Sequence, residues 1–236
     1  MRLDRFLCKQ ADYSRKTVLQ LLAQQQIKVD GKTIHHRAYP VTAFSNIEIQ
    51  GKPLHNRSAQ YYMLNKPAGF LSATIDHKHP TVLELFTGIN TEQLHIAGRL
   101  DRATTGLLLL TNDGKWSRKL TELKSIGQPK IPKVYWVETA HAISPETEQR
   151  FAEGIYFRTE NTTTSPAKFE IISEKISRLT IYEGRYHQVK RMYAAVGNRV
   201  VNLHREQVGN IQLDPQLTLG MFRKLTVQEV EWVFLR

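Results

Sequence analysis

The chain of 236 residues is nearly without cysteine, and it has no long apolar run. Because Cys8 is the only cysteine, no internal disulfide and no cysteine-based zinc site can form. No stretch approaches the ~18 apolar residues that a membrane-spanning helix needs, and the opening MRLDRFLCKQ is too charged for a signal-peptide core. The paired histidines His35/His36 and His77/His79 lack acidic or cysteine partners at ligand spacing. These absences predict a soluble cytoplasmic protein with no membrane partner and no bound metal.

Several catalytic signatures are also missing. No glycine-rich phosphate loop and no G-x-S-x-G motif is present. Asp101, in GRLDRATTGLLLLTNDG at 98–114, has no acidic neighbour until Asp113. That isolation argues against the carboxylate clusters of Mg²⁺-dependent nucleases and against the paired carboxylates of glycosidases. What remains is a single ionised aspartate that acts as a nucleophile and is oriented by a cation.

Positive charge is abundant and unevenly distributed. The net charge is +11 and the pI about 9.8, which indicates a polyanionic partner. Residues 1–57 contain 10 Lys and Arg against 4 Asp and Glu, whereas residues 58–236 contain 23 against 18. We therefore expect a small, strongly basic module at 1–57 and a larger, nearly balanced module at 58–236, with a polar linker at 51–60.

The first module predicts two helices followed by short strands. Ser14 is placed to cap a second helix that runs to about Gln25. IKVDGKTI at 27–34 alternates apolar and polar residues around an Asp-Gly pair, which is typical of a hairpin, and Asn46–Gln50 is expected to add a strand.

This module resembles the S4 RNA-binding domain. The matching segments are RLDRFL at 2–7, SRKTV at 14–18 and IKVDGK at 27–32, although Gln24 and Gln25 stand where the S4 pattern usually has a glycine. The resemblance implies an RNA-binding face made of Arg2, Arg5, Arg15, Lys16 and Lys28. The alternative is a solvated helical surface.

In the second module, short apolar runs outnumber helical segments and do not alternate strictly with them. We therefore predict an α+β fold with a mixed, largely antiparallel sheet, in which Leu107–Leu110 form a buried strand. Three helices are expected: one from behind Asn112-Asp113 to about Leu120, one capped by Ser144 with Pro145 first, and one from about Tyr186 to Val196, ended by Gly197.

Two further segments carry reactive side chains. KVYWV at 133–137 places Lys133 and Tyr135 on one face of a strand, although a single tyrosine there is more typical of a core position than of a catalytic one. EGRYHQVKRM at 183–192 forms a second basic surface around an apolar helical stripe, and it includes Arg185, His187, Lys190 and Arg191.

Taken in order, these motifs resemble the RsuA family of pseudouridine synthases, whose members modify small-subunit ribosomal RNA. The matching segments are LNKPAGF at 64–70, GRLDRATTGLLLLTNDG at 98–114, KVYWV at 133–137, EGRYHQVKRM at 183–192 and VVNLHREQVG at 200–209. With the S4-like start they cover nearly the whole chain in the family's order.

The resemblance implies roles for individual residues. Asp101 occupies the position of the catalytic aspartate, Tyr135 that of the tyrosine that stacks on the target base, and Lys190 that of the basic partner of the aspartate. Leu203 matches the hydrophobic wall of the uracil pocket, and Arg99 matches an arginine near the flipped nucleotide. We expect the remaining basic residues of 183–192 to contact substrate RNA: Arg185, His187 and Arg191.

The isomerisation of uridine needs no cofactor, so none is expected, and we expect a monomer whose partner is ribosomal RNA. Two alternatives stay open at this point. The enzyme could act on large-subunit ribosomal RNA, or the chain could be a non-catalytic ribosomal RNA-binding assembly factor. A nuclease is a third, weaker possibility.

Overall fold

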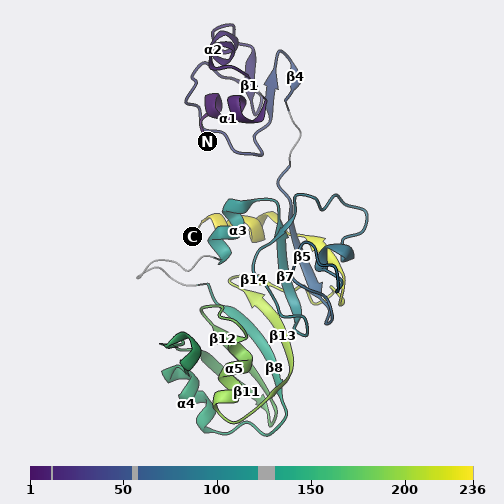
Figure 1. Cartoon of the computed structure of the whole chain (residues 1–236), viewed down its shortest axis with the longest axis vertical. Coiled ribbons are helices and arrows are strands. Elements are labelled where there is room, and N and C mark those ends of the chain that lie inside the picture. Colours follow the sequence, from purple (N-terminus) through teal and green to yellow (C-terminus); the bar gives the residue numbers. More distant parts are fainter. Residues whose placement is uncertain (12, 55–57, 122–130, 236) are drawn as a thin grey trace. The chain divides into compact units, whose positions relative to one another are not determined.

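The computed structural model describes residues 1–11, 13–54, 58–121 and 131–235 (Figure 1). The chain divides into two compact units, Met1–Ala59 and Gln60–Arg236.

The first unit packs two helices on a small sheet. The helices are α1 (Leu3–Gln10) and α2 (Arg15–Ala23). The strands are β1 (Ile27–Val29), β2 (Lys32–Thr33), β3 (Ile47–Ile49) and β4 (Lys52–Pro53), which are antiparallel in the order β2-β1-β3-β4. The Ser14 side chain accepts a hydrogen bond from the Thr17 amide and so caps α2 as predicted. The core of this unit consists of side chains that are fully buried or nearly so, among them Leu3, Leu7, Val18, Ile27, Val29 and Ile47.

Backbone turns explain how this short sheet closes. Asp30 and Gly31 both adopt positive φ (50° and 79°), the conformation that a two-residue hairpin with the strands' natural twist requires. Gln25, where the S4 pattern favours glycine, is also left-handed, with φ of 57°. The prediction of a polar linker at 51–60 is wrong for Lys52–Pro53, which form β4 and pair with β3. Residues 55–57 of that segment lie outside the described residues.

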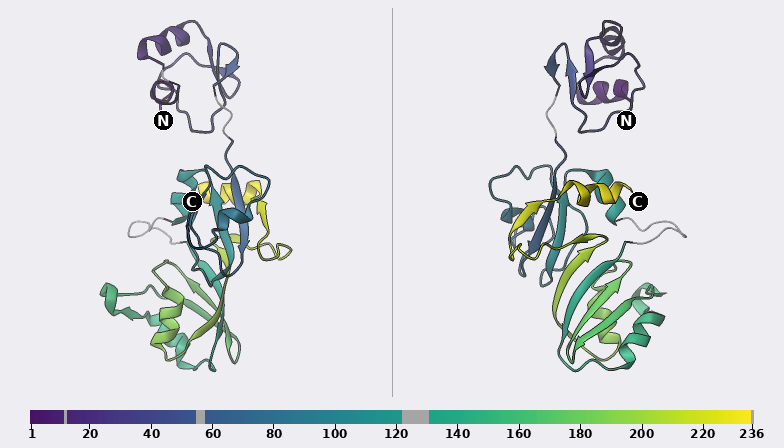
Figure 2. Two further views of the ribbon diagram at one scale, coloured as in Figure 1. Left: turned by 45° about the vertical axis from the view of Figure 1, so that its right-hand side comes forward. Right: turned by 180° about the vertical axis from the view of Figure 1, so that it is seen from behind.

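The second unit is built on a nine-stranded sheet, shown from two further directions in Figure 2. Its strands are β5 (Tyr61–Lys66), β6 (His95–Ile96), β7 (Thr105–Thr111), β8 (Lys133–Thr139), β11 (Lys168–Ser173), β12 (Ile176–Ile181), β13 (Val200–Val208), β14 (Ile211–Gln212) and β15 (Phe222–Lys224). The order is β11-β12-β8-β13-β7-β5-β15, with β14 beside β13 and β6 beside β7. Every described pairing is antiparallel except that of β13 with β7. The predicted mixed, largely antiparallel sheet is confirmed.

Helices cover this sheet in two groups. Those of the unit are α3 (Gly114–Thr121), α4 (Glu146–Glu153), α5 (Gln188–Ala195) and α6 (Val227–Phe234), with 3₁₀ turns at Val82–Leu85 and Arg158–Glu160 and a small strand pair β9 (Tyr156–Phe157) and β10 (Thr162–Thr163). Rings of Phe151 on α4 and Tyr193 on α5 meet edge to face at 5.2 Å. The indole of Trp116 on α3 donates a hydrogen bond to the Val230 carbonyl on α6. Helix α6 was not among the three helices predicted.

The leucine run of β7 is buried on both faces. Leu108 and Leu110 belong to the core that contains Phe151 and Tyr193, whereas Leu107 and Leu109 belong to the core that contains Trp116. All four leucines are fully buried. A strand with a core on each side needs apolar residues at successive positions rather than alternate ones, which explains the unbroken run.

The single parallel pairing brings two backbones unusually close. Gly106 on β7 has a φ of 101°, and a Cβ built on it would lie 2.6 Å from the backbone nitrogen of Arg205 on β13. Real Cβ atoms do not approach backbone so closely, so only glycine fits at this position.

We therefore predict that Gly106→Ala destabilises the second unit by about 3 kcal/mol or more, because either the β7–β13 pairing separates or the backbone is strained. Gly88→Ala is the matched control, since Gly88 also has positive φ (79°) but open space around it, and it should cost about 1 kcal/mol. Urea unfolding of both variants provides the measurement. Equal losses in the two would contradict the close-approach explanation.

Candidate active site

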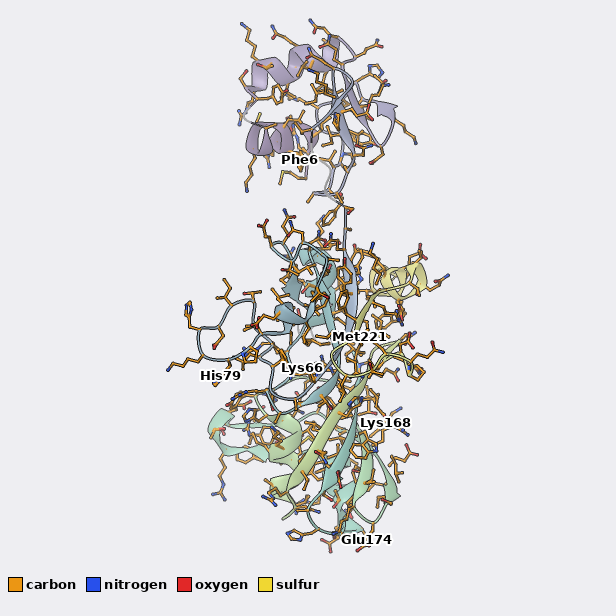
Figure 3. All side chains as sticks on the ribbon, turned by 90° about the vertical axis from the view of Figure 1, so that its right-hand side faces the viewer. Phe6, Lys66, His79, Lys168, Glu174 and Met221 are labelled. Carbon is orange, nitrogen blue, oxygen red and sulfur yellow. The ribbon has the colours of Figure 1, made fainter. Side chains whose placement is uncertain are left out.

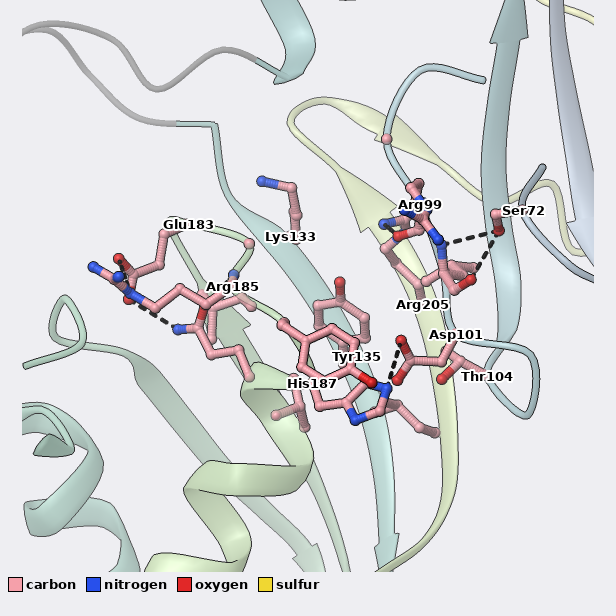
Figure 4. A pocket seen from close by; sticks show the side chains of 18 of the residues that line it. Ser72, Arg99, Asp101, Thr104, Lys133, Tyr135, Glu183, Arg185, His187 and Arg205 are labelled. Atoms are coloured by element: carbon pink, nitrogen blue, oxygen red, sulfur yellow. Dashed lines mark hydrogen bonds and ion pairs between the residues drawn. The ribbon is translucent and has the colours of Figure 1, made fainter. Parts of the chain in front are cut away.

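Asp101 lies in a turn just before the leucine strand. Its carbonyl accepts a hydrogen bond from the Thr104 amide at 3.0 Å. The neighbouring Leu100 exchanges two hydrogen bonds with the hydroxyl of Ser72, at 2.8 and 3.1 Å. The strand therefore does not carry the carboxylate itself. It anchors a short turn, and the turn projects Asp101 into a pocket with 30% of its side chain exposed (Figure 4).

A buried lysine restrains that turn through hydrogen bonds to backbone carbonyls. Lys66, the last residue of β5 (Figure 3), is fully buried, and its ammonium donates to the carbonyls of Pro67, Arg102 and Thr104 at 3.0, 3.2 and 2.9 Å. Burial lowers the pKa of Lys66 to about 8, and the negative charge of Asp101 opposes that shift. Lys66 lies in the motif LNKPAGF, from which no role for the lysine was predicted. A lysine at the end of an apolar strand was the available signal.

Both carboxylate oxygens of Asp101 face a basic side chain. The Lys190 ammonium lies 3.2 Å from Oδ2, and Nε2 of His187 lies 3.4 Å from Oδ1. Both residues come from the start of α5, where His187 adopts a left-handed conformation (φ 49°) and stacks on Tyr186 with ring centroids 3.8 Å apart. The predicted pairing of Lys190 with Asp101 is present in the geometry. His187, which was expected to touch substrate, lines the pocket and in addition contacts the carboxylate.

The pocket has a volume of about 1020 Å³, enough for a nucleotide and its neighbours. Tyr135 on β8 and Leu203 on β13 both line it, and each is almost entirely buried. In the sheet register, Tyr135 lies opposite Arg205 and Leu203 lies opposite Val137. Residues separated by up to about a hundred positions in sequence thus meet at one face of the sheet.

Arg205 is a second pocket residue for which the sequence motifs predicted no role. It is buried, and its guanidinium donates to the carbonyls of Leu107 at 2.8 Å and Arg99 at 3.3 Å. These bonds tie β13 to the start of β7 and to the segment that leads into Asp101. Its position within VVNLHREQVG was the only signal.

The other predicted substrate-contacting residues divide into two groups. Arg99 and Arg185 line the pocket, but the Arg185 guanidinium is paired with Glu160 and Glu183, at 2.9 and 3.3 Å. Arg191 is not among the pocket-lining residues. It binds Glu160 and lies over the Phe157 ring, 3.6 Å from its centroid. The structure thus does not bring Arg191 to the pocket and engages its guanidinium with Glu160 and the Phe157 ring instead.

On the first unit, the predicted RNA-binding residues are not equivalent. Arg2 forms an ion pair with Asp4 at 2.6 Å. The other four residues of the predicted face have exposed side chains: Arg5, Arg15, Lys16 and Lys28.

Across both units, the described residues contain no cluster of three side chains that could bind a metal ion. No helix among them is long and apolar enough to cross a bilayer.

We predict that Lys66→Met lowers kcat by about 10²-fold, because the three carbonyls lose their common donor and the Asp101 turn shifts. RNA affinity should change little, since distributed phosphate contacts dominate it. Lys115→Met, an exposed lysine on α3, serves as the control. Single-turnover kinetics make the measurement, and a kcat close to that of the control would contradict the positioning role of Lys66.

Known proteins that are similar to this chain in sequence and in structure are pseudouridine synthases. The signature of the RNA pseudouridylate synthase family matches residues 60–195. Ribosomal small subunit pseudouridine synthase A of Pseudomonas aeruginosa is 47% identical over 98% of this chain and 99% of its own length. The protein of that name from Escherichia coli K12 is 41% identical over 98% of each chain. A crystal structure of a pseudouridylate synthase superimposes with a TM-score of 0.70 and 38% identity over 99% of both chains. The chain belongs to the RNA pseudouridylate synthase family.

Proposed function

We propose that this protein converts a uridine of small-subunit ribosomal RNA to pseudouridine. The observation that carries the proposal is the Asp101 carboxylate, held in a pocket between Lys190 and His187. In the reaction the bond between C1′ and N1 breaks, the uracil rotates, and a bond between C1′ and C5 forms. C5 loses a proton and N1 gains one, so the overall change is an isomerisation without redox chemistry.

Asp101 is the group that attacks the nucleotide or stabilises a cationic sugar at C1′. Either role requires the anionic carboxylate, and the Lys190 ammonium 3.2 Å away favours that form and restricts its rotamer. The turn anchored by Lys66 supplies the rigidity that such a reaction needs, because displacements near 1 Å can cost about 10²-fold in rate.

Tyr135 and Leu203 form the receiving surface for the uracil. A base inside a helix cannot be reached by the carboxylate, so the nucleotide is flipped into the pocket. Tyr135 replaces the lost stacking and Leu203 closes the apolar wall. Arg99 at the pocket rim faces the backbone of the flipped nucleotide.

The names of the relatives favour small-subunit RNA over large-subunit RNA as the substrate. A non-catalytic assembly factor would not require a carboxylate placed between two basic groups in a pocket. The nuclease alternative is disfavoured by the missing carboxylate cluster around Asp101 in the described part of the chain.

The first unit serves as an S4-type RNA-binding domain, and the protein acts as a monomer with ribosomal RNA as its partner. The support is the helix-helix-hairpin arrangement with exposed cations at the start of α2. Arg15 and Lys16 oppose the helix dipole there, so they do not serve helix stability.

Deletion of the gene, followed by pseudouridine-specific sequencing of ribosomal RNA, tests the function. We expect one site to be lost from small-subunit RNA. Wild-type protein and the control Asp76→Asn, an exposed aspartate, should restore it, whereas Asp101→Asn should restore less than ~1%. Loss of a large-subunit site instead would contradict the substrate, and restoration by Asp101→Asn would contradict the role of the aspartate.

The first unit generates a separate prediction. Replacing Arg5, Arg15 and Lys16 with Gln should lower the log–log salt slope of RNA affinity by roughly 2–3 units, at ~0.7–0.9 per phosphate contact. The single-turnover rate at saturating RNA should survive. Lys32→Gln with Lys52→Gln, on strands β2 and β4, is the control. An unchanged slope would mean that the basic face is only a solvated surface, and a collapsed rate would mean that the first unit helps to build the active site.

A further inference from the structure

Lys133 is a pocket residue that the reaction described above does not use. It begins β8, two residues before Tyr135, so both side chains leave the strand on the same face, and both line the pocket. Figure 4 shows Lys133 and Asp101 on either side of Tyr135. A Cβ on Gly184 would lie 4.0 Å from the Lys133 ammonium. Because residue 184 is glycine, it has no side chain that could cover the ammonium.

No protein group within the described ranges neutralises this ammonium by a hydrogen bond or an ion pair. The neighbouring carboxylate, Glu183, interacts with other groups. Its Oε1 accepts hydrogen bonds from the Ser165 amide and the Gln188 side chain, each at 2.9 Å, and its Oε2 lies 3.3 Å from Nε of Arg185.

A second cation, Arg205, lines the same pocket as Lys133. Arg205 pairs with Tyr135 and Val208 pairs with Lys133 in the register of β13 with β8. The guanidinium of Arg205 is hydrogen-bonded to two backbone carbonyls, which carry no net charge. Burial is the main cause that lowers the pKa of Lys133 to about 8, and repulsion by Arg205 adds to it, whereas the negative charge of Glu183 raises this pKa. A half-buried ammonium beside a second positive charge is destabilised, and an anion bound next to it would stabilise its charged form.

We propose that the Lys133 ammonium binds a backbone phosphate of the RNA next to the uridine that enters the pocket. The proposal rests on the function proposed above. Phosphodiesters are the anionic groups of RNA at neutral pH, and a lysine binds them as a point charge. Lys133 is therefore a binding residue that holds the nucleotide beside Tyr135, whereas Asp101 performs the chemistry.

This role has a pH signature with a definite sign. The lysine binds phosphate only when protonated, so in the free enzyme the site weakens as the pH rises through about 8. The charged groups that face it are Arg205 from β13 and Glu183 after β12. Since kcat/KM reports groups of the free enzyme, the dependence should appear there and not in kcat. Lys66 titrates in the same range, but it is common to all variants compared.

The test compares wild type, Lys133→Met and Lys133→Arg on in vitro transcribed small-subunit ribosomal RNA at several salt concentrations and pH values. Lys168→Met, an exposed lysine at the start of β11, is the control. For Lys133→Met we expect kcat/KM to fall about 10–100-fold through KM, with kcat kept. The salt slope should fall by ~0.7–0.9, and the loss of kcat/KM from pH 7 to 9 should shrink. Lys133→Arg should restore the slope and remove the pH dependence, because arginine stays charged.

An unchanged KM and salt slope in Lys133→Met would overturn the proposal, as would a loss confined to kcat. The unfolding temperature of Lys133→Met should not fall, because methionine replaces an unpaired ammonium, and a large fall would show a structural role instead. If wild type binds the transcript but does not isomerise it, the proposed function fails. The salt slope of binding by wild type and Lys133→Met then still decides whether the lysine meets a phosphate.

Discussion

The buried ammonium of Lys66 is the interaction on which the rest of the site depends. A single, fully buried donor group binds the carbonyls of Arg102 and Thr104, just after Asp101, and that of Pro67, just after β5. Removal of a lysine from water is costly, as its lowered pKa shows. In exchange, these hydrogen bonds restrain the turn that carries Asp101. The carboxylate is therefore held in place beside Lys190 and His187.

The sheet explains why these groups meet at all. Strand β7 is buried between two cores, and its close contact with β13 at Gly106 joins the halves of the sheet. Arg205 crosses this join and bonds to backbone on both β7 and the segment before Asp101. Asp101 therefore comes from the turn before β7, Tyr135 from β8 and Leu203 from β13, yet all three are positioned by one continuous sheet.

Local pattern predicted the elements well. The Ser14 cap, the Asp-Gly hairpin and the leucine strand all follow from short-range rules, and the family motifs indicated that Asp101 and Lys190 pair. Long-range contacts could not be predicted in this way. A lysine or arginine is usually exposed, so their positions in apolar segments were only weak signals that Lys66 and Arg205 are buried. Charge alone could not show that Arg191 pairs with Glu160.

The most direct test of the account is the release of tritium from C5 of uridine. Small-subunit and large-subunit transcripts labelled at that carbon would be incubated with excess protein without added metal or cofactor. The account predicts release of one equivalent per small-subunit molecule, matched by one pseudouridine, and none from large-subunit RNA, because the proton leaves C5 only when C1′ bonds there. Absence of release from small-subunit RNA would contradict it.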